Sequence, residues 1–441
     1  MIQTIRKAWG VPELRKKIVF TLLILLIFRI GNAIPVPYIN TTLLGNYLDS
    51  MSGTVLGLYN VMSGGAFAEA TVFALGVQPY INSSIIIQLL TIAIPALERL
   101  ARDGGEAGKK KIASITRYAT VAIALLQGFG YYMICKNYNI LEQQGIWPAL
   151  VIIVSFVAGS SFVMWLGEQV NEFGVGNGIS IILFAGILSR VPNMVTMGAS
   201  YIRTKGSIGY LWIALLIVGM LAMVVLIVHV NEPERRIPVQ YAKRQVGRKM
   251  YGGQNTHIPI KVNMSGVMPI IFAGSILSIP PTIQMFIPSA KLADSKFWTG
   301  FFKVFTSTHW AYGIIYFILI IAFAYFYSSI QYNPIEMSQN IAKNGGMIPG
   351  IRTGRPTSDY IARIISRITL LGALLLSVVA IFPIVFSQLT TLILTKTTVY
   401  ADGMNVSLGG TSIIILVGVA LETVKQLESQ MMMRHYKGFL D

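Results

Sequence analysis

The sequence is poor in the residues that build disulfides and metal sites. Its 441 residues include one cysteine, Cys135, and four histidines. A single cysteine excludes an internal disulfide, and histidines scattered along the chain do not form a Cys/His metal cluster. We therefore expect no metal, no cofactor and no metalloenzyme chemistry.

Charged residues are also scarce. They make up 12% of the chain, against 54% hydrophobic residues, which excludes an ordinary soluble protein and indicates that most of the chain lies in lipid. The 35 lysines and arginines outnumber the 18 aspartates and glutamates, so the formal net charge is +17. Such a basic excess should lie in loops that face anionic lipid or an anionic partner.

Long apolar runs predict an all-α membrane protein. A membrane-spanning helix needs roughly 20 mostly apolar residues, and ten segments of this kind carry few charges. The segment 176–195 is the least regular, because it begins with Gly176, Asn177 and Gly178 and contains Arg190. The ten predicted spans are 18–33, 73–95, 115–134, 147–167, 176–195, 209–229, 263–286, 310–330, 364–390 and 411–427.

The distribution of lysine and arginine predicts the orientation of these spans, because basic residues are retained on the cytoplasmic side. With the N-terminus inside, the inner segments hold 23 basic residues and the outer loops hold seven. Both termini are therefore predicted to be cytoplasmic. The inner segments are 1–17, 96–114, 168–175, 230–262, 331–363 and the tail 428–441.

The first span resembles a secretory signal peptide in its basic start and its apolar run. However, Arg29 interrupts the run, and the residues from Gly31 to Pro35 form no convincing cleavage site. We interpret this segment as a retained first helix.

Ten spans divide into two sets of five around an external hinge loop, 196–208. An odd number of spans in each half places the halves in opposite orientations, as in inverted-repeat transport proteins whose pathway lies between the repeats. The predicted units are an N-terminal half, 1–195, a C-terminal half, 209–427, and a cytosolic tail, 428–441.

A glycine-rich segment, 55–67, is too short to span a membrane and too apolar for a solvated loop. It either re-enters the protein, which requires a cavity for its irregular backbone, or lies on the outer membrane surface as an amphipathic segment. The residues themselves leave both alternatives open.

The second span is unusually polar for a lipid-facing helix, so at least one of its faces must meet water or another polar helix. Ile81 and Ile85 share a face between the polar groups because they are four residues apart. Isoleucine in a membrane helix more often faces lipid or packs against neighbours, and a pore-lining position is the alternative. The polar residues are Gln78, Asn82, Ser83, Ser84 and Gln88.

Ionisable residues are nearly absent from the interiors of the spans. Coupled transporters place Asp, Glu or His at mid-membrane, whereas here only Arg29, Arg190 and Glu422 lie beyond the first and last turns of a span. The segment 103–110 lacks the first glycine and the closing Ser/Thr of a phosphate-binding loop. We therefore predict that the chain is not an enzyme and that energy for transport comes from elsewhere.

The inner loops 230–262 and 331–363 are longer than membrane topology requires. The first mixes cations with tyrosines, which suits phosphate backbones or an acidic protein surface, and the second presents Arg352 at a turn flanked by glycines. The alternative is that these charges serve only the positive-inside rule. The residues of the first loop are Arg235, Arg236, Lys243, Arg244, Arg248 and Lys249, with Tyr241 and Tyr251.

Eight motifs follow one another over essentially the whole chain, at 28–37, 63–67, 73–87, 176–180, 241–245, 261–269, 348–352 and 409–412. Together they resemble the bacterial SecY family, the central subunits of the protein-export channel. The resemblance implies a hydrophobic ring at mid-membrane, a re-entrant plug that seals it from outside, and a lateral gate between the halves that releases apolar segments into lipid. An apolar collar of this kind would exclude ions and water by dewetting.

The resemblance also assigns residues to these parts. Leu183 departs from the isoleucine common in the family, but it can still close an apolar ring. The implied ring is Ile81, Ile85, Ile179, Leu183, Ile271 and Ile415. The implied plug, roughly 56–67, contains Leu56, Leu58, Tyr59, Asn60, Val61, Met62, Ser63, Gly64, Gly65 and Phe67. Lateral-gate contacts are implied for Gln88, Gln127, Ser275 and Ile279.

Two docking regions are implied on the cytosolic side. Arg352 matches the loop arginine at the motor's docking site, although Thr353 and Gly354 stand where many relatives have Pro and Gly. The basic loop used by motor and ribosome is matched by Arg235, Arg236, Arg248 and Lys249.

The expected function is a channel in the bacterial cytoplasmic membrane that conducts unfolded secretory polypeptides outward and membrane segments sideways. A small-solute transporter shares inverted repeats, but the scarcity of mid-membrane ionisable groups and the basic loops disfavour it. The polar second helix disfavours an accessory scaffold without a pore. The implied partners are the small membrane subunits SecE and SecG, the SecA ATPase, the ribosome, signal sequences, nascent or unfolded polypeptides and anionic lipids.

Overall fold

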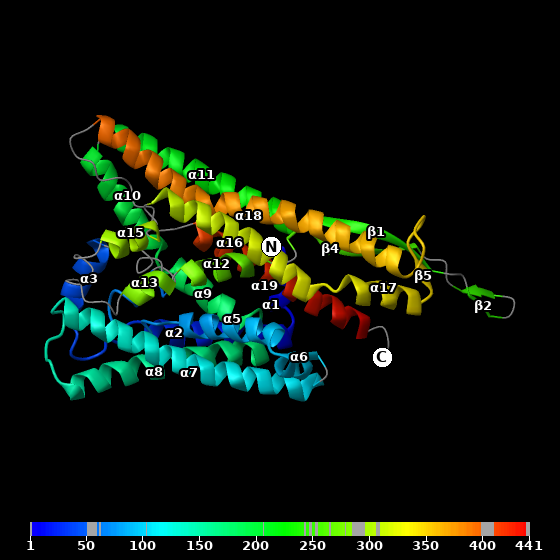
Figure 1. Cartoon of the computed structure of the whole chain (residues 1–441), viewed down its shortest axis with the longest axis horizontal. Coiled ribbons are helices and arrows are strands. Elements are labelled where there is room, and N and C mark those ends of the chain that lie inside the picture. The colour runs from blue at the N-terminus through cyan, green and yellow to red at the C-terminus, as the bar shows by residue number, and fades with distance from the viewer. Residues whose placement is uncertain are drawn as a thin grey trace.

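The computed structural model of the chain is mostly helical, and its long helices run roughly along one axis (Figure 1). The structure describes residues 2–50, 60, 63–102, 104–205, 207–241, 244–246, 249–251, 255–263, 266–277, 279–284, 296–305, 309–397 and 410–437.

The first five predicted spans all fall on helices. The second span begins at Gln78 because a series of turns occupies residues 63–77, and the fifth is broken after Leu188. The elements are α1 (Ile2–Trp9), α2 (Pro12–Gly31), α3 (Thr41–Ser50), α5 (Gln78–Ala93), α6 (Pro95–Arg102), α7 (Gly105–Asn137), α8 (Ile146–Phe173), α9 (Gly178–Leu188) and α10 (Val191–Lys205).

The last five predicted spans also fall on helices. The seventh, 263–286, is divided between α12 and α13, and the ninth lies within a helix of 43 residues. The elements are α11 (Ser207–Asn231), α12 (Met268–Leu277), α13 (Ile279–Gln284), α15 (Lys296–Val304), α16 (Trp310–Gln331), α17 (Pro334–Lys343), α18 (Arg355–Thr397) and α19 (Gly410–Lys437).

Within the part of the chain that the structure describes, five helical segments are long and apolar enough to cross a membrane unbroken, and they correspond to α7, α8, α11, α16 and α18. Helices α5 and α6 form a further pair that is bent by 105°, at Pro95, which cannot donate a helical hydrogen bond. The remaining spans are carried by α2 and α19, which have charged ends, and by the short apolar helices α9 and α12. The prediction of a helical multi-pass membrane protein is confirmed.

The segment predicted as an external hinge loop, 196–208, is largely helical. Helix α10 runs through it to Lys205, and α11 begins at Ser207. Val191 and Val195 are exposed, and none of the α10 residues whose exposure the structure describes is buried, so these residues form no buried apolar face from which the helix could have been predicted.

A small sheet was not predicted at all. Strands β1 (Glu234–Tyr241) and β4 (Asn255–Lys261) pair antiparallel, with Glu234 opposite Lys261, and β5 (Gly346–Met347) pairs with the end of β1. Two further short strands, β2 (Arg244–Val246) and β3 (Lys249–Tyr251), form a separate hairpin. The sheet therefore joins the two long inner loops, 230–262 and 331–363, into one unit.

The hydrophobic core has its largest cluster where helices of the two halves meet. It combines α2, α5, α8 and α9 with α11, α12, α16, α18 and α19. A second cluster packs α3, residues 36–39 and 67–75, α7 and α8, and a third joins the sheet to α17 and α18. The sheet and α17 lie at one end of the molecule, and α3, α10 and α15 lie at the other (Figure 1).

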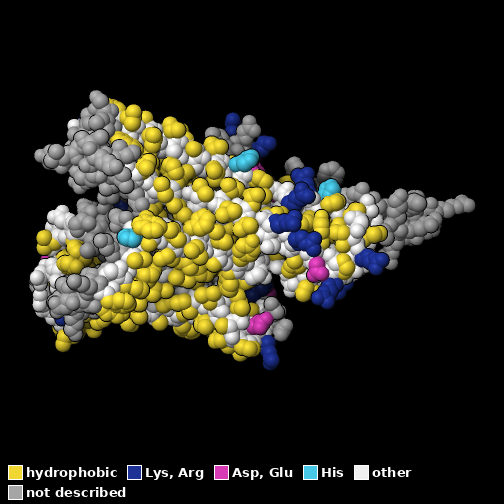
Figure 2. Space-filling model, turned by 45° about the horizontal axis from the view of Figure 1, so that its top comes forward, with side chains coloured by type: hydrophobic (Ala, Val, Ile, Leu, Met, Phe, Trp, Pro, Cys, Tyr) yellow, Lys and Arg dark blue, Asp and Glu magenta, His cyan; other side chains and the backbone are white. Residues whose placement is uncertain are grey.

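The surface matches this division. Apolar side chains form a broad belt over the middle of the molecule, and Lys and Arg side chains gather between this belt and the tip that carries the sheet (Figure 2). Large apolar residues on the long helices, such as Leu26, Leu125, Val218 and Leu221, are exposed, which is the pattern of a lipid-facing surface.

Candidate functional site

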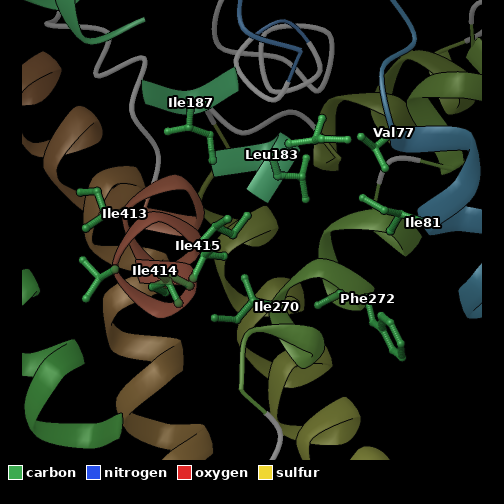
Figure 3. Packing of buried hydrophobic residues seen from close by; sticks show 14 of the residues in the cluster. Val77, Ile81, Leu183, Ile187, Ile270, Phe272, Ile413, Ile414 and Ile415 are labelled. Atoms are coloured by element: carbon green, nitrogen blue, oxygen red, sulfur yellow. The ribbon is translucent and has the colours of Figure 1, made fainter. Parts of the chain in front are cut away.

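Four of the six predicted ring residues are buried in the central cluster. Ile81 and Ile85 come from α5, Leu183 from α9 and Ile415 from α19. The side chains of Ile81, Leu183 and Ile415 approach a common region from three different helices (Figure 3). These four predicted ring residues therefore belong to one buried cluster although they are far apart in the sequence.

The other two predicted ring residues, Ile179 and Ile271, are partly buried and pack against the same cluster. In α12 the neighbouring residue Ile270 is fully buried and also belongs to the cluster (Figure 3). The sequence analysis did not single out Ile270, because neighbouring isoleucines in a short apolar helix give no periodic signal that distinguishes them.

The position of α9 is determined by close backbone packing on α8. A Cβ on Gly178 would lie 2.0 Å from the carbonyl oxygen of Gly167, so only glycine fits there. The Gly178 amide donates to Asn171 Oδ1 at 2.8 Å, and the Ser180 amide donates to Asn177 Oδ1 at 3.3 Å, which caps the helix. These contacts determine where α9 begins and hence where Leu183 lies.

The predicted plug is described only in part. Leu56, Leu58, Tyr59, Val61 and Met62 lie outside the described residues. Asn60, Ser63 and Phe67 are buried. Gly64 and Gly65 have positive φ angles of 72° and 97°, a conformation that glycine adopts without steric cost.

The predicted lateral-gate residues lie on two pairs of packed helices. Gln88 and Gln127 are half-buried on α5 and α7, which pack against each other. Ser275 is buried on α12, which packs against α16, and Ile279 at the start of α13 is exposed. Two of these residues thus lie on the α5–α7 pair of the N-terminal half, and the other two lie on α12 and α13 of the C-terminal half.

A buried hydroxyl cluster joins α5 to α7. Ser83 Oγ lies 2.6 Å from Thr120 Oγ1, and both residues have no exposed surface. Ser83 Oγ also donates to the carbonyl of Thr116 at 3.3 Å. Ser83 was noted in the sequence only as one polar residue of the second span, and its partners on α7 could not be inferred from spacing.

The predicted docking residues lie at the end of the molecule that carries the sheet. Arg235 and Arg236 are exposed on β1, Lys249 lies in β3, and Arg248 lies outside the described residues. Arg352 is exposed in the turn between β5 and α18.

Hydrogen bonds hold this turn. Thr357 Oγ1 donates to the Arg352 carbonyl at 2.8 Å, and Ser338 Oγ of α17 donates to the Gly354 carbonyl at 2.9 Å. The turn therefore has a defined conformation even though Thr353 and Gly354 occupy the positions of the family's more rigid Pro and Gly.

The chemistry of the central cluster is apolar. Among the described residues, no group of three or more His, Cys, Asp or Glu side chains could hold a metal ion. Branched aliphatic side chains from several helices can close around a narrow path and exclude water, and they can adapt to many different chains because they make no directional bonds.

Comparison with known proteins agrees with this geometry. Residues 71–424 match the family described as SecY. The chain is 41% identical to the protein translocase subunit SecY of Streptomyces galbus over the full length of both chains, and 42% identical to that of Mycobacterium tuberculosis over 97% of both.

Two solved structures share the fold. A structure of SecY described for the role of its plug domain in the closed state has a TM-score of 0.56 and is 16% identical, with 96% of each chain covered. Sec61 in a canine ribosome–channel complex has a TM-score of 0.52 and is 15% identical, again with 96% of each chain covered.

Proposed function

We propose, from the premise that this chain belongs to the SecY family, that its central apolar cluster is the seal of a protein-conducting channel. The observation that carries the proposal is that Ile81, Leu183 and Ile415, from three helices of both halves, are buried in one apolar cluster. Aliphatic walls make a narrow path dry at rest, and they let an extended polypeptide pass without binding it tightly.

The plug completes the seal. A solved SecY relative is described as having a plug domain that stabilises the closed state of the translocation channel and maintains a membrane seal. We assign the same role to the segment 56–67, whose described residues Asn60, Ser63 and Phe67 are buried, with Phe67 in the second cluster. Transported chains would displace it, and apolar segments would leave between the α5–α7 and α12–α16 pairs.

The work of transport comes from partners. The exposed cations Arg235, Arg236 and Arg352 offer a surface to a cytosolic ATPase of the SecA type or to a translating ribosome, and a relative in the fold was solved in a ribosome–channel complex. Small membrane subunits of the SecE and SecG types would cover part of the apolar belt. Signal sequences, unfolded polypeptides and anionic lipids are the remaining proposed partners.

The distribution of basic residues supports one orientation. The sheet and its cations belong to the inner loops of the topology, so this end would face the cytoplasm of a bacterium, with both termini on the same side. The end with α3, α10 and α15 would face outward.

Site-directed crosslinking tests the channel directly. A photoreactive residue at position 81 should crosslink efficiently to a secretory chain stalled during export. The matched control is position 86, on the same helix but exposed, where we expect little crosslinking to the stalled chain. If position 81 does not crosslink to the stalled chain, or crosslinks no better than position 86, the result would contradict the channel and would favour a small-solute transporter.

Deletion of residues 57–66 tests the plug. A closed state favoured by about 3 kcal/mol keeps the open state below about 1%, and a buried apolar signal helix can overcome this difference. The deletion should leave export intact while increasing resting ion conductance and accepting defective signal sequences. A transporter with the same deletion should lose transport without gaining a leak.

A further inference from the structure

The segment that follows Asn60 is held by side chains from three different helices. Tyr131 Oη of α7 donates to the Phe67 carbonyl at 2.7 Å. Asn32 Nδ2, at the end of α2, donates to the Ser63 carbonyl at 3.3 Å. Ser189 Oγ, at the end of α9, lies 3.4 Å from the Gly64 carbonyl. Three carbonyls within five residues are thus bonded to three separate helices.

Tyr131 makes the strongest of these contacts. Its hydroxyl forms the shortest of the three hydrogen bonds, and its ring meets the Phe67 ring edge-on at 4.8 Å between centroids. On its other side the ring packs against Phe156 of α8 at 4.6 Å. All three side chains are buried, so Tyr131 clamps the Phe67 backbone and side chain together onto the α7–α8 pair.

The same segment is closed upon itself. Asn60 Oδ1 accepts from the Ala68 amide at 3.0 Å, and the Asn60 carbonyl accepts from the Gly65 amide at 2.8 Å. Ser63 Oγ accepts from the Phe67 amide at 3.1 Å. These bonds tie Asn60 and residues 63–68 to one another.

This segment also lies directly against the helix that carries Leu183. A Cβ on Gly64 would lie 2.8 Å from Ser189 Oγ and 2.9 Å from the Gly186 carbonyl oxygen. This close approach leaves little room for the segment to shift while α9 stays in place.

We propose that Asn60 and residues 63–68 hold the plug in its closed position, and that Tyr131 is the positioning residue that stabilises this closed state through Phe67. The inference rests on the proposed channel function. Without the Tyr131 hydroxyl, the buried Phe67 carbonyl is left in the closed state with the longer bond from the Ala70 amide at 3.4 Å, whereas a displaced segment can find water. Loss of the Tyr131 hydroxyl therefore shifts the equilibrium toward the open channel.

Tyr131→Phe tests this role because it removes the hydroxyl and keeps the ring. In the full chain, reconstituted with its membrane partners, we expect resting conductance to rise by about three- to tenfold, which is the effect of one buried hydrogen bond. Export of a precursor with a defective signal sequence should rise, and export with an intact signal should stay unchanged. The matched control is Tyr132→Phe, which removes a hydroxyl from the next residue of α7.

Ser189→Ala tests whether the rise in conductance follows the strength of the hydrogen bond that is removed. Its hydroxyl donates to the Gly186 carbonyl at 2.7 Å and only approaches the Gly64 carbonyl at 3.4 Å. We therefore expect a smaller rise in conductance than for Tyr131→Phe. A larger rise would contradict the ranking that the distances imply.

Combining Tyr131→Phe with the deletion of residues 57–66 distinguishes a failure of the proposed role of Tyr131 from a failure of the plug assignment. If Tyr131 acts through the plug, Tyr131→Phe adds no further leak to the deletion variant. An added leak there means general loosening of the protein and overturns the proposed role of Tyr131. If the deletion variant leaks but Tyr131→Phe conducts no more than Tyr132→Phe, the proposed role of Tyr131 is wrong and the plug assignment still holds. If the deletion variant does not leak, both the plug assignment and the proposed role of Tyr131 are wrong.

Discussion

Gln240 of β1 lies opposite Met347 of β5 in an antiparallel ladder, so two inner loops that are about a hundred residues apart in sequence share one sheet. The neighbouring residue Gly346 lies against the β1 side chains. A Cβ there would be 2.9 Å from Tyr241 Cε1 and 3.1 Å from Val239 Cγ1. The loop that presents Arg352 is therefore positioned by the loop that presents Arg235 and Arg236.

The first prediction concerns this pairing. Gly346→Ala should push β5 away from β1, because the added methyl group meets a rigid ring and a branched side chain of the sheet. We expect at least a severalfold weaker binding of a cytosolic partner that contacts both loops, measured by titration on proteoliposomes. Met347→Ala, one residue further along β5 where the side chain is half-exposed, is the control. Unchanged binding by Gly346→Ala would show that the loops dock independently.

A second prediction concerns the docking turn. Arg352→Glu replaces a donor by a repelling charge, which should weaken a partner contact by roughly 2–5 kcal/mol if the arginine is desolvated there. ATP-driven export should fail while the channel still assembles. Arg355→Glu is the matched charge reversal, because it places an acid in the first turn of α18, where a negative charge is favourable for the helix. Equal loss of export in both variants would indicate a response to net charge alone.

A third prediction concerns the seal. Ile81→Asn combined with Ile271→Asn should hydrate the collar and raise resting ion conductance, since dewetting depends on apolar walls. The control is Ile81→Val with Ile271→Val, which keeps the walls apolar and should stay closed. Planar-bilayer recordings would decide between the pairs. If the double asparagine variant conducts no more ions at rest than the double valine variant, Ile81 and Ile271 do not form the ring.

The membrane fold was predictable because each span is a long run of mostly apolar residues. The run that became α9 was the least regular, and its helix ends at Leu188 rather than at 195, because its final residues continue into the exposed helix α10. The sheet was missed since β1 alternates exposed and buried residues only from Arg236 to Gln240, and Pro238 lies within this short run, which weakens the prediction of a strand.

The site was predictable to a smaller extent. The ring positions came from the family resemblance, and periodicity could pair only Ile81 with Ile85. The contacts made by Tyr131 and Thr120 depend on how α7 packs against Phe67 and Ser83. No spacing in the sequence encodes a contact between helices, so these residues carried no signal before the fold was known.

The last prediction concerns the path by which packing on α8 positions the ring. Gly159 of α8 lies against the segment that leads into α5, and a Cβ there would be 1.9 Å from the carbonyl oxygen of Val72. One residue further on, Ser160 Oγ donates to the Gly76 carbonyl at 3.2 Å. Helix α8 is thus in direct backbone contact with the residues that determine where Gln78 begins the second span.

Gly159→Ala should therefore displace the start of α5, and Ile81 with it. Overpacking of this kind costs about 1–3 kcal/mol, so we expect a lower midpoint of thermal unfolding in detergent together with a leak at rest. Gly274→Ala in α12 is the matched control, because a Cβ there meets no atom within 4 Å. That change should stabilise its helix by about 0.5–1 kcal/mol through the lower chain entropy of alanine. A Gly159→Ala variant that is as stable and as tight as Gly274→Ala would mean that α5 does not depend on α8 for its position.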